Sequence, residues 1–185
     1  MAVIVLNGMP GSGKTRLAIE LAKKLDIEQI IQTDTIKELF YIQNYPELAY
    51  CATHCAWQFL GMKSLQNIIN GFLAHTKFFE NTLLKIIEVT QEKGKNIIVE
   101  GVQITPRIYS IIKTKDKIGF FLTIDKQERL RRFELKNNRR SIKNYFWYEN
   151  VGVIILIDKY LKNEAIKNNI VILENKDIEL SIDFI

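Results

Sequence analysis

Short apolar runs alternate along this chain with longer segments in which apolar residues recur every three or four positions. Runs of the first kind are typical of strands buried on both faces of a sheet, and the periodic segments are typical of helices. The runs expected to be strands are 3–6, 29–32, 96–99, 118–124 and 169–173. This alternation predicts an α/β fold with a parallel five-stranded sheet flanked by helices.

Two segments do not fit a simple alternation of strands and helices. Residues 46–93 are mostly helical, with Phe79, Leu83 and Ile87 on one face. So much helix between two consecutive strands predicts an inserted substrate-binding arm. Residues 151–157 fit a strand or a buried helix by periodicity alone. Their flanks have helical patterns, which favours the helix.

A glycine-rich segment follows the first expected strand and opens a helix. It matches GxxxxGK[ST] at every fixed position, with the residues Gly8, Met9, Pro10, Gly11, Ser12, Gly13, Lys14 and Thr15. In such a P-loop the backbone N–H groups and the helix N-terminus cradle phosphates, the lysine reaches the β- and γ-phosphates, and the hydroxyl binds Mg²⁺. The motif predicts a three-layer P-loop NTPase fold of nucleotide-kinase type that binds ATP and Mg²⁺ through these eight residues.

Acidic residues end two of the expected strands. Glu100 ends the third strand, where an acid of a P-loop fold holds Mg²⁺, usually through water; the alternative is an acid that caps the next turn. Asp34 ends the second strand, where it could bind or deprotonate the acceptor hydroxyl. Its alternative is a helix N-cap within residues 33–35, and the two roles can coexist.

Arginines gather after the fourth expected strand, at positions 129, 131, 132, 139 and 140. The helix that carries the first three is expected to begin with an Asp125–Glu128 capping box. Because guanidinium groups bind phosphates bidentately, residues 129–145 are expected to form a lid. Arg129 is assigned to the nucleotide, and Arg132 and Arg139 to catalysis at the γ-phosphate. A solvated basic helix face is the alternative for each arginine.

Length and charge limit the classes of protein that remain. The 185 residues, of which 47% are hydrophobic, fit a single domain spanning 1–185. The net charge of +5 suits an anionic ligand such as a nucleotide. A nucleic-acid binder would need basic residues along a groove with interleaved aromatics, and here the basic cluster lies beside the predicted phosphate site. No apolar run reaches the roughly 20 residues of a membrane span.

The two cysteines indicate neither a disulfide framework nor a metal site. Cys51 and Cys55 give no disulfide framework, and the first residues lack the pattern of a signal peptide, so a cytosolic setting is expected. Cys51, His54 and Cys55 together suggest a zinc site. Structural zinc takes four ligands, and no second Cys/His pair is present, so packing within the arm is the preferred interpretation.

Beyond the P-loop, several segments resemble the kinase domain of archaeal 2-phosphoglycerate kinase. They are residues 32–38, 56–57, 71–72, 93–106, 131–133 and 169–175. The family usually has His where this chain has Gln103. The resemblance implies ATP-dependent phosphorylation of a hydroxyl, on a small phosphorylated acid such as 2-phosphoglycerate.

The sequence therefore predicts an ATP-dependent small-molecule kinase. A nucleoside or nucleotide kinase with the same apparatus is the nearest alternative. A nucleotide-dependent switch that transfers no phosphate is an alternative of another class. A GTPase switch would carry an Asn-Lys-x-Asp motif, and here Asp177 follows Lys176 directly, so the spacing fails.

Overall fold

The computed structural model describes residues 1–138 and 146–185. Its strands are β1 (Val3–Asn7), β2 (Gln29–Gln32), β3 (Ile97–Glu100), β4 (Lys117–Thr123) and β5 (Val171–Glu174). They form one parallel sheet in the order β2-β3-β1-β4-β5. The expected five-stranded parallel sheet is confirmed, and each strand lies within two residues of its predicted bounds at either end.

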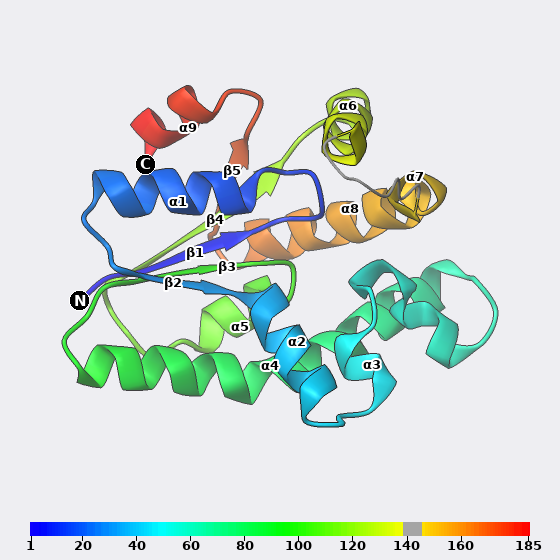
Figure 1. Ribbon diagram of the computed structural model, residues 1–185, viewed down its shortest axis with the longest axis horizontal. Coiled ribbons are helices and arrows are strands. Elements are labelled where there is room, and N and C mark those ends of the chain that lie inside the picture. Colours follow the sequence, from blue (N-terminus) through cyan, green and yellow to red (C-terminus); the bar gives the residue numbers. More distant parts are fainter. Residues whose placement is uncertain (139–145) are drawn as a thin grey trace.

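Helices cover both faces of the sheet (Figure 1). Their bounds are α1 (Lys14–Lys24), α2 (Thr33–Ile42), α3 (Glu47–Tyr50), the 3-10 helix η1 (Thr53–Leu60), α4 (Leu65–Glu92), α5 (Pro106–Ile111), α6 (Lys126–Asn138), α7 (Phe146–Glu149), α8 (Val151–Lys167) and α9 (Ile178–Phe184). α1 and α9 lie on one face, and α4, α5 and α8 lie on the other. The arrangement confirms the three-layer α/β fold.

Buried side chains on alternate positions of β1 explain this layering. Ile4 and Leu6 pack with Leu17 and Leu21 of α1, whereas Val3 and Val5 pack on the opposite side with helices that include α4. Both faces of the strand are thus withdrawn from water, which is why β1 reads as a continuous apolar run and not as an alternating one.

Residues 151–157 form the first part of α8, as their flanks indicated. Val153, Ile154 and Ile157 are at most 1% exposed and belong to the same apolar cluster as Phe121 of β4 and Phe72 of α4. The segment lacks alternation because its helix is covered on several sides.

The segment expected as an inserted arm has two parts. Residues 46–64 form α3, η1 and their connections, and the first part of α4 packs against η1. Further along α4, Phe79, Leu83 and Ile87 are buried in the core cluster that includes Val3 and Val5 of β1. The second half of α4 therefore belongs to the layer beneath the sheet, and only the preceding part extends beyond it (Figure 1).

The carboxyl ends of the parallel strands meet at one edge, where ligands bind in open α/β sheets. β1 leads into the P-loop and α1, β2 leads directly into α2, and β3 ends in Glu100. The arm and α6 also lie at this edge (Figure 1). Among the described residues, no helix combines the length and apolar character needed to cross a membrane.

Candidate active site

The P-loop connects β1 to α1 through a backbone path that its glycines permit. Gly11 and Gly13 have φ values of 86° and 91°, a region that other residues rarely adopt. Gly13 is also the N-cap residue of α1, so the helix begins at Lys14 without a side-chain cap. The first N–H groups of α1 are consequently available for an anion.

Lys14 is largely buried in this loop, with 9% exposure. Its Nζ lies 3.4 Å from the backbone oxygen of Met9. Burial lowers the pKa of Lys14 below its ordinary value, and the nearby carboxylates of Glu100 and Asp34 oppose this effect. A desolvated cation with so few partners gains strongly from a bound anion, so the site is suited to phosphate.

Thr15 and Glu100 come together across the gap between α1 and β3. The Thr15 hydroxyl donates a hydrogen bond of 2.7 Å to Oε1 of Glu100. Burial raises the pKa of Glu100, while Lys14 and the Thr15 hydroxyl lower it. A hydroxyl and a carboxylate are the oxygen ligands that Mg²⁺ prefers, so this pair fits the predicted metal role.

A cavity of about 530 Å³ extends from the P-loop to the arm. Lys14, Thr15 and Glu100 line it on one side, and residues of α2 and η1 line it on the other. The lining residues on the α2 and η1 side are Thr33, Asp34, Lys37, Ala52, Thr53 and His54. The cavity therefore has room for a phosphate chain and a second small molecule.

Asp34 lines this cavity from the first turn of α2, and not from the end of β2. β2 ends at Gln32, which is also the N-cap residue of α2, so the alternative role of Asp34 as the helix cap is wrong. Its side chain is 76% exposed and forms an ion pair of 3.0 Å with Lys37. The carboxylate is thus accessible to a ligand at the carboxyl edge of the sheet.

A directed chain of buried hydrogen bonds links the sheet to the arm. The Thr33 hydroxyl donates to Oε1 of Gln103, and Nε2 of Gln103 donates to Oγ1 of Thr53 at 3.0 Å. Thr53 Oγ1 lies 3.3 Å from Nε2 of His75, whose Nδ1 lies 2.7 Å from the oxygen of Leu48. Because a carbonyl only accepts, Nδ1 carries the proton and Nε2 accepts from Thr53.

These hydrogen bonds fix the cavity wall, and the sequence pattern did not indicate them. The residues that form them are far apart in the sequence, and only the difference from the family at Gln103 pointed to any of them. Neighbouring His54 is 3% exposed, and its Nε2 has no hydrogen-bond partner among the described residues.

Arg129 is located behind the P-loop. It is 1% exposed, forms an ion pair of 3.0 Å with Asp158 of α8, and donates to the backbone oxygen of Pro10. Asp158 also accepts a hydrogen bond of 3.4 Å from the hydroxyl of Thr123 in β4. The structure thus gives Arg129 a contact to the loop backbone.

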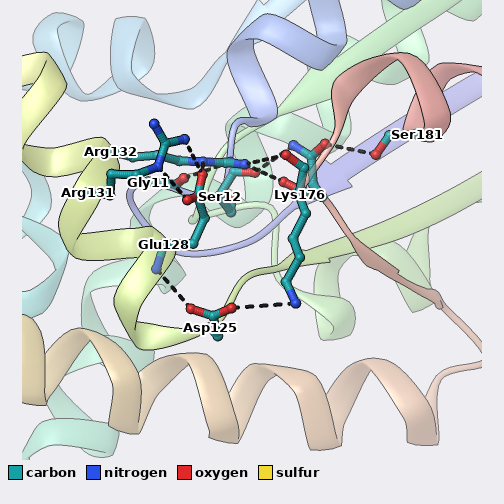
Figure 2. Close-up of polar contacts among 9 residues, drawn as sticks. Gly11, Ser12, Asp125, Glu128, Arg131, Arg132, Lys176 and Ser181 are labelled. Atoms are coloured by element: carbon teal, nitrogen blue, oxygen red, sulfur yellow. Dashed lines mark hydrogen bonds and ion pairs between the residues drawn. The ribbon is translucent and has the colours of Figure 1, made fainter.

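Arg132 donates hydrogen bonds to protein oxygen atoms at the side of the P-loop (Figure 2). Its Nε donates to Glu128 at 2.7 Å, its Nη1 to the Gly11 oxygen at 3.2 Å, and its Nη2 to the Asn175 oxygen at 2.6 Å. Glu128 pairs with arginines and does not close a capping box, although Asp125 caps α6 as expected. Arg139 lies outside the described residues.

No group of three or more potential metal ligands occurs among the Cys, His, Asp and Glu residues that the structure describes. Cys51 Sγ donates to the Leu48 oxygen at 3.5 Å and lies 3.9 Å from Nδ1 of His75. His54 packs its ring 4.8 Å from that of Phe146. Cys51 and His75 thus contact each other within the arm, whereas His54 contacts α7.

The two histidines should make stability depend on pH. Burial lowers the pKa of both from 6.5 to about 4. The unfolded state then binds more protons between these values, so stability is complete above about pH 6.5 and falls as the pH drops toward 4. We expect a loss of roughly 1–2 kcal/mol per histidine between pH 7 and pH 5. Chemical denaturation across this range measures it.

A His54→Gln/His75→Gln variant is the control for this prediction. Glutamine does not titrate, so the double variant should show a flatter profile between pH 7 and pH 5 even if it is less stable throughout. Equal slopes for the parent and the variant would contradict the prediction.

Comparison with known proteins agrees with this geometry. A family model described as "AAA domain" matches residues 4–152. The chain is 28% identical to "2-phosphoglycerate kinase" of Methanothermobacter thermautotrophicus and 29% identical to that of Pyrococcus furiosus, over 99% of its own length in each case. It spans 63% and 62% of the length of these relatives. The resemblance found in the sequence is thereby confirmed.

Solved structures show the same fold. A shikimate kinase from Bacteroides thetaiotaomicron superposes with a TM-score of 0.59 at 18% identity, covering 99% of this chain and 95% of that one. A sugar kinase from Janibacter sp. superposes with a TM-score of 0.62 at 12% identity, covering 100% and 91%. At such identities the likeness concerns the arrangement of strands and helices.

Proposed function

Because the chain belongs to the AAA domain family, with a complete P-loop, we propose that it transfers the γ-phosphate of ATP to a hydroxyl of a small molecule. The observation that carries the proposal is the single cavity that joins the P-loop to Asp34 and the arm. A nucleotide-binding protein without an acceptor does not need this cavity to extend beyond the P-loop to acidic, basic and hydroxyl side chains of α2 and η1.

Each residue of the P-loop side has a role in this reaction. The loop amides and Lys14 hold the phosphate chain and neutralise its charge. Thr15 and Glu100 would hold Mg²⁺, which supplies further charge neutralisation when bound. Binding of the phosphates restores the pKa of Lys14, because the anion compensates for the loss of hydration around the buried ammonium group.

Asp34 acts on the acceptor side. Its carboxylate accepts the hydroxyl proton as the oxygen attacks, while Lys37 holds it in place through the ion pair. Reaction within a cavity excludes bulk water, which limits hydrolysis of ATP. Residues 46–64 and the first part of α4 would bind the acceptor.

A phosphorylated acid such as 2-phosphoglycerate is the first acceptor to test. Two relatives of this chain carry that activity in their names, and Lys37 offers a cation on the acceptor side of the cavity. The neutral imidazole of His54 adds a hydrogen-bonding group that suits a hydroxyl.

The test is ADP release from ATP and Mg²⁺ in the presence of single acceptors. Glycerate phosphates should be assayed first, and nucleosides, nucleotides and shikimate should form the comparison set. The proposal expects ADP formation that depends on one acceptor, with the phosphorylated product identified by mass spectrometry. Slow ADP release that no acceptor accelerates would favour a nucleotide-dependent switch and would refute the kinase.

A further inference from the structure

Three consecutive carbonyl groups of the P-loop each accept a hydrogen bond from a side chain outside the loop. The donors are Arg129 Nη1 to the oxygen of Pro10 (2.5 Å), Arg132 Nη1 to that of Gly11 (3.2 Å) and Asn175 Nδ2 to that of Ser12 (2.7 Å). They come from α6 and from the segment that follows β5. Two separate elements of the fold thus hold one short turn.

The direction of these carbonyls determines where the neighbouring N–H groups point. In a trans peptide the C=O of one residue and the N–H of the next lie on opposite sides of the bond. When Pro10 and Ser12 turn their oxygens toward the outer side chains, the N–H groups of Gly11 and Gly13 face the other way. The Ser12 N–H bonds to the Met9 oxygen at 3.2 Å and completes the turn.

The donors are themselves held by further contacts. Arg129 is ion-paired with buried Asp158, and Arg132 is ion-paired with Glu128 at 2.7 Å. Oδ1 of Asn175 accepts a hydrogen bond of 2.8 Å from the hydroxyl of Ser181 in α9. Figure 2 shows Arg132 with its contacts to Glu128 and Gly11. A donor fixed in this way loses little entropy when it binds the loop.

The fit between loop and donors is close. A Cβ atom at Gly13 would lie 2.5 Å from Nδ2 of Asn175 and 3.2 Å from Nη1 of Arg132. Glycine is therefore required at this position by the packing of the donors as well as by its φ of 91°.

We propose that Arg129, Arg132 and Asn175 are positioning residues that hold the P-loop peptides in their phosphate-binding orientation before the nucleotide arrives. The inference rests on the proposed function only in taking the loop as the phosphate site. Donors already aligned with the anion need no reorganisation on binding, which strengthens both affinity and catalysis. Arg129 and Arg132 would then act on the nucleotide through the loop.

The decisive variant is Asn175→Leu, because Asn175 is buried, close to leucine in size, and carries no charge. The probes are ATP and inorganic tripolyphosphate, with dissociation constants measured by calorimetry. We expect affinity for both to fall by about tenfold or more. Thr90→Val is the control: it replaces a buried polar side chain by an apolar one and removes its hydrogen bond to Ile86, but in α4 and away from the loop. It should bind both probes as the parent does.

An Arg129→Lys variant supplies a second measurement should Asn175→Leu fail to fold. Lysine keeps the charge beside Asp158 but lacks the two-pronged geometry that reaches Pro10 as well, so tripolyphosphate affinity should again fall by about tenfold. Unchanged tripolyphosphate affinity in the folded variants would overturn the proposal, even if ATP affinity fell, since the residues would then act on the nucleoside. A parent that did not bind tripolyphosphate would overturn it too.

These outcomes are separate from those of the kinase assay. If the parent binds ATP and tripolyphosphate but phosphorylates no acceptor, the proposed function is refuted. The positioning role is still supported in that case if Asn175→Leu lowers the affinity for both probes. If the parent phosphorylates an acceptor and the variants Asn175→Leu and Arg129→Lys bind both probes as tightly as the parent does, only the positioning role is refuted.

Discussion

Lys14→Ala is expected to reduce phosphoryl transfer by about 10³-fold or more, because it removes the one loop side chain whose charge reaches the transferring phosphate. The fold should survive. Lys14 is a desolvated cation whose pKa is lowered by burial, so its removal relieves a cost in the unliganded protein. Without ATP the variant should therefore unfold at the same temperature as the parent or at a higher one. Steady-state kinetics and thermal unfolding measure the two effects.

Lys23→Ala is the control for this variant. Lys23 lies on the same helix, its side chain is 68% exposed, and it pairs with Glu20 at the surface. Its removal should change neither turnover nor ATP affinity. Near-normal turnover by Lys14→Ala would refute the kinase assignment.

Asp34→Asn is expected to lower transfer to the acceptor by about 10²-fold or more while ATP affinity stays near normal. Asparagine has the size of aspartate but neither its charge nor its basicity. Because Asp34 lies in the first turn of α2, loss of the charge should also cost a few tenths of a kcal/mol through the helix dipole and the ion pair with Lys37. Acceptor kinetics, ATP titration and thermal unfolding on one variant separate these effects.

Glu38→Gln provides the comparison. Glu38 is an exposed acid one turn further along α2, outside the cavity lining. It controls for the loss of one negative charge from this helix and should leave transfer unchanged. Full activity of Asp34→Asn would end the general-base proposal, whereas an equal loss in both variants would indicate a long-range effect of charge.

The sequence was sufficient for the sheet because its strands are buried on both faces. An apolar run such as 3–6, bounded by polar or glycine-rich turns, has few alternatives in an α/β chain. The P-loop was equally clear, since its fixed residues are neighbours in the sequence and their geometry is local. α8 was identified through its flanks and not from its own periodicity.

Features that depend on packing could not be predicted in the same way. Asn175 meets Ser12 only because β5 and the P-loop end at the same edge of the sheet, and nothing in the sequence near either residue marks the contact. The buried partner of Arg129 is Asp158, which lies on a different helix. From sequence alone, an arginine cluster beside a phosphate site is expected to bind phosphate. Arginines that donate to backbone carbonyls have the same local sequence pattern, so the two cases cannot be told apart.

The position of β1 has a consequence for biosynthesis. Among the strands of this sheet β1 is made first, yet its partners are β3 and β4, so that Val3 pairs with Ile97 and with Lys117. Until that later part of the chain is made, the apolar run that becomes the centre of the sheet has no neighbour and is exposed to other nascent chains. Pairing over such sequence separations is slow, because loop-closure entropy must be lost before any contact is gained. Chaperone binding to β1 would protect this run until its partners emerge.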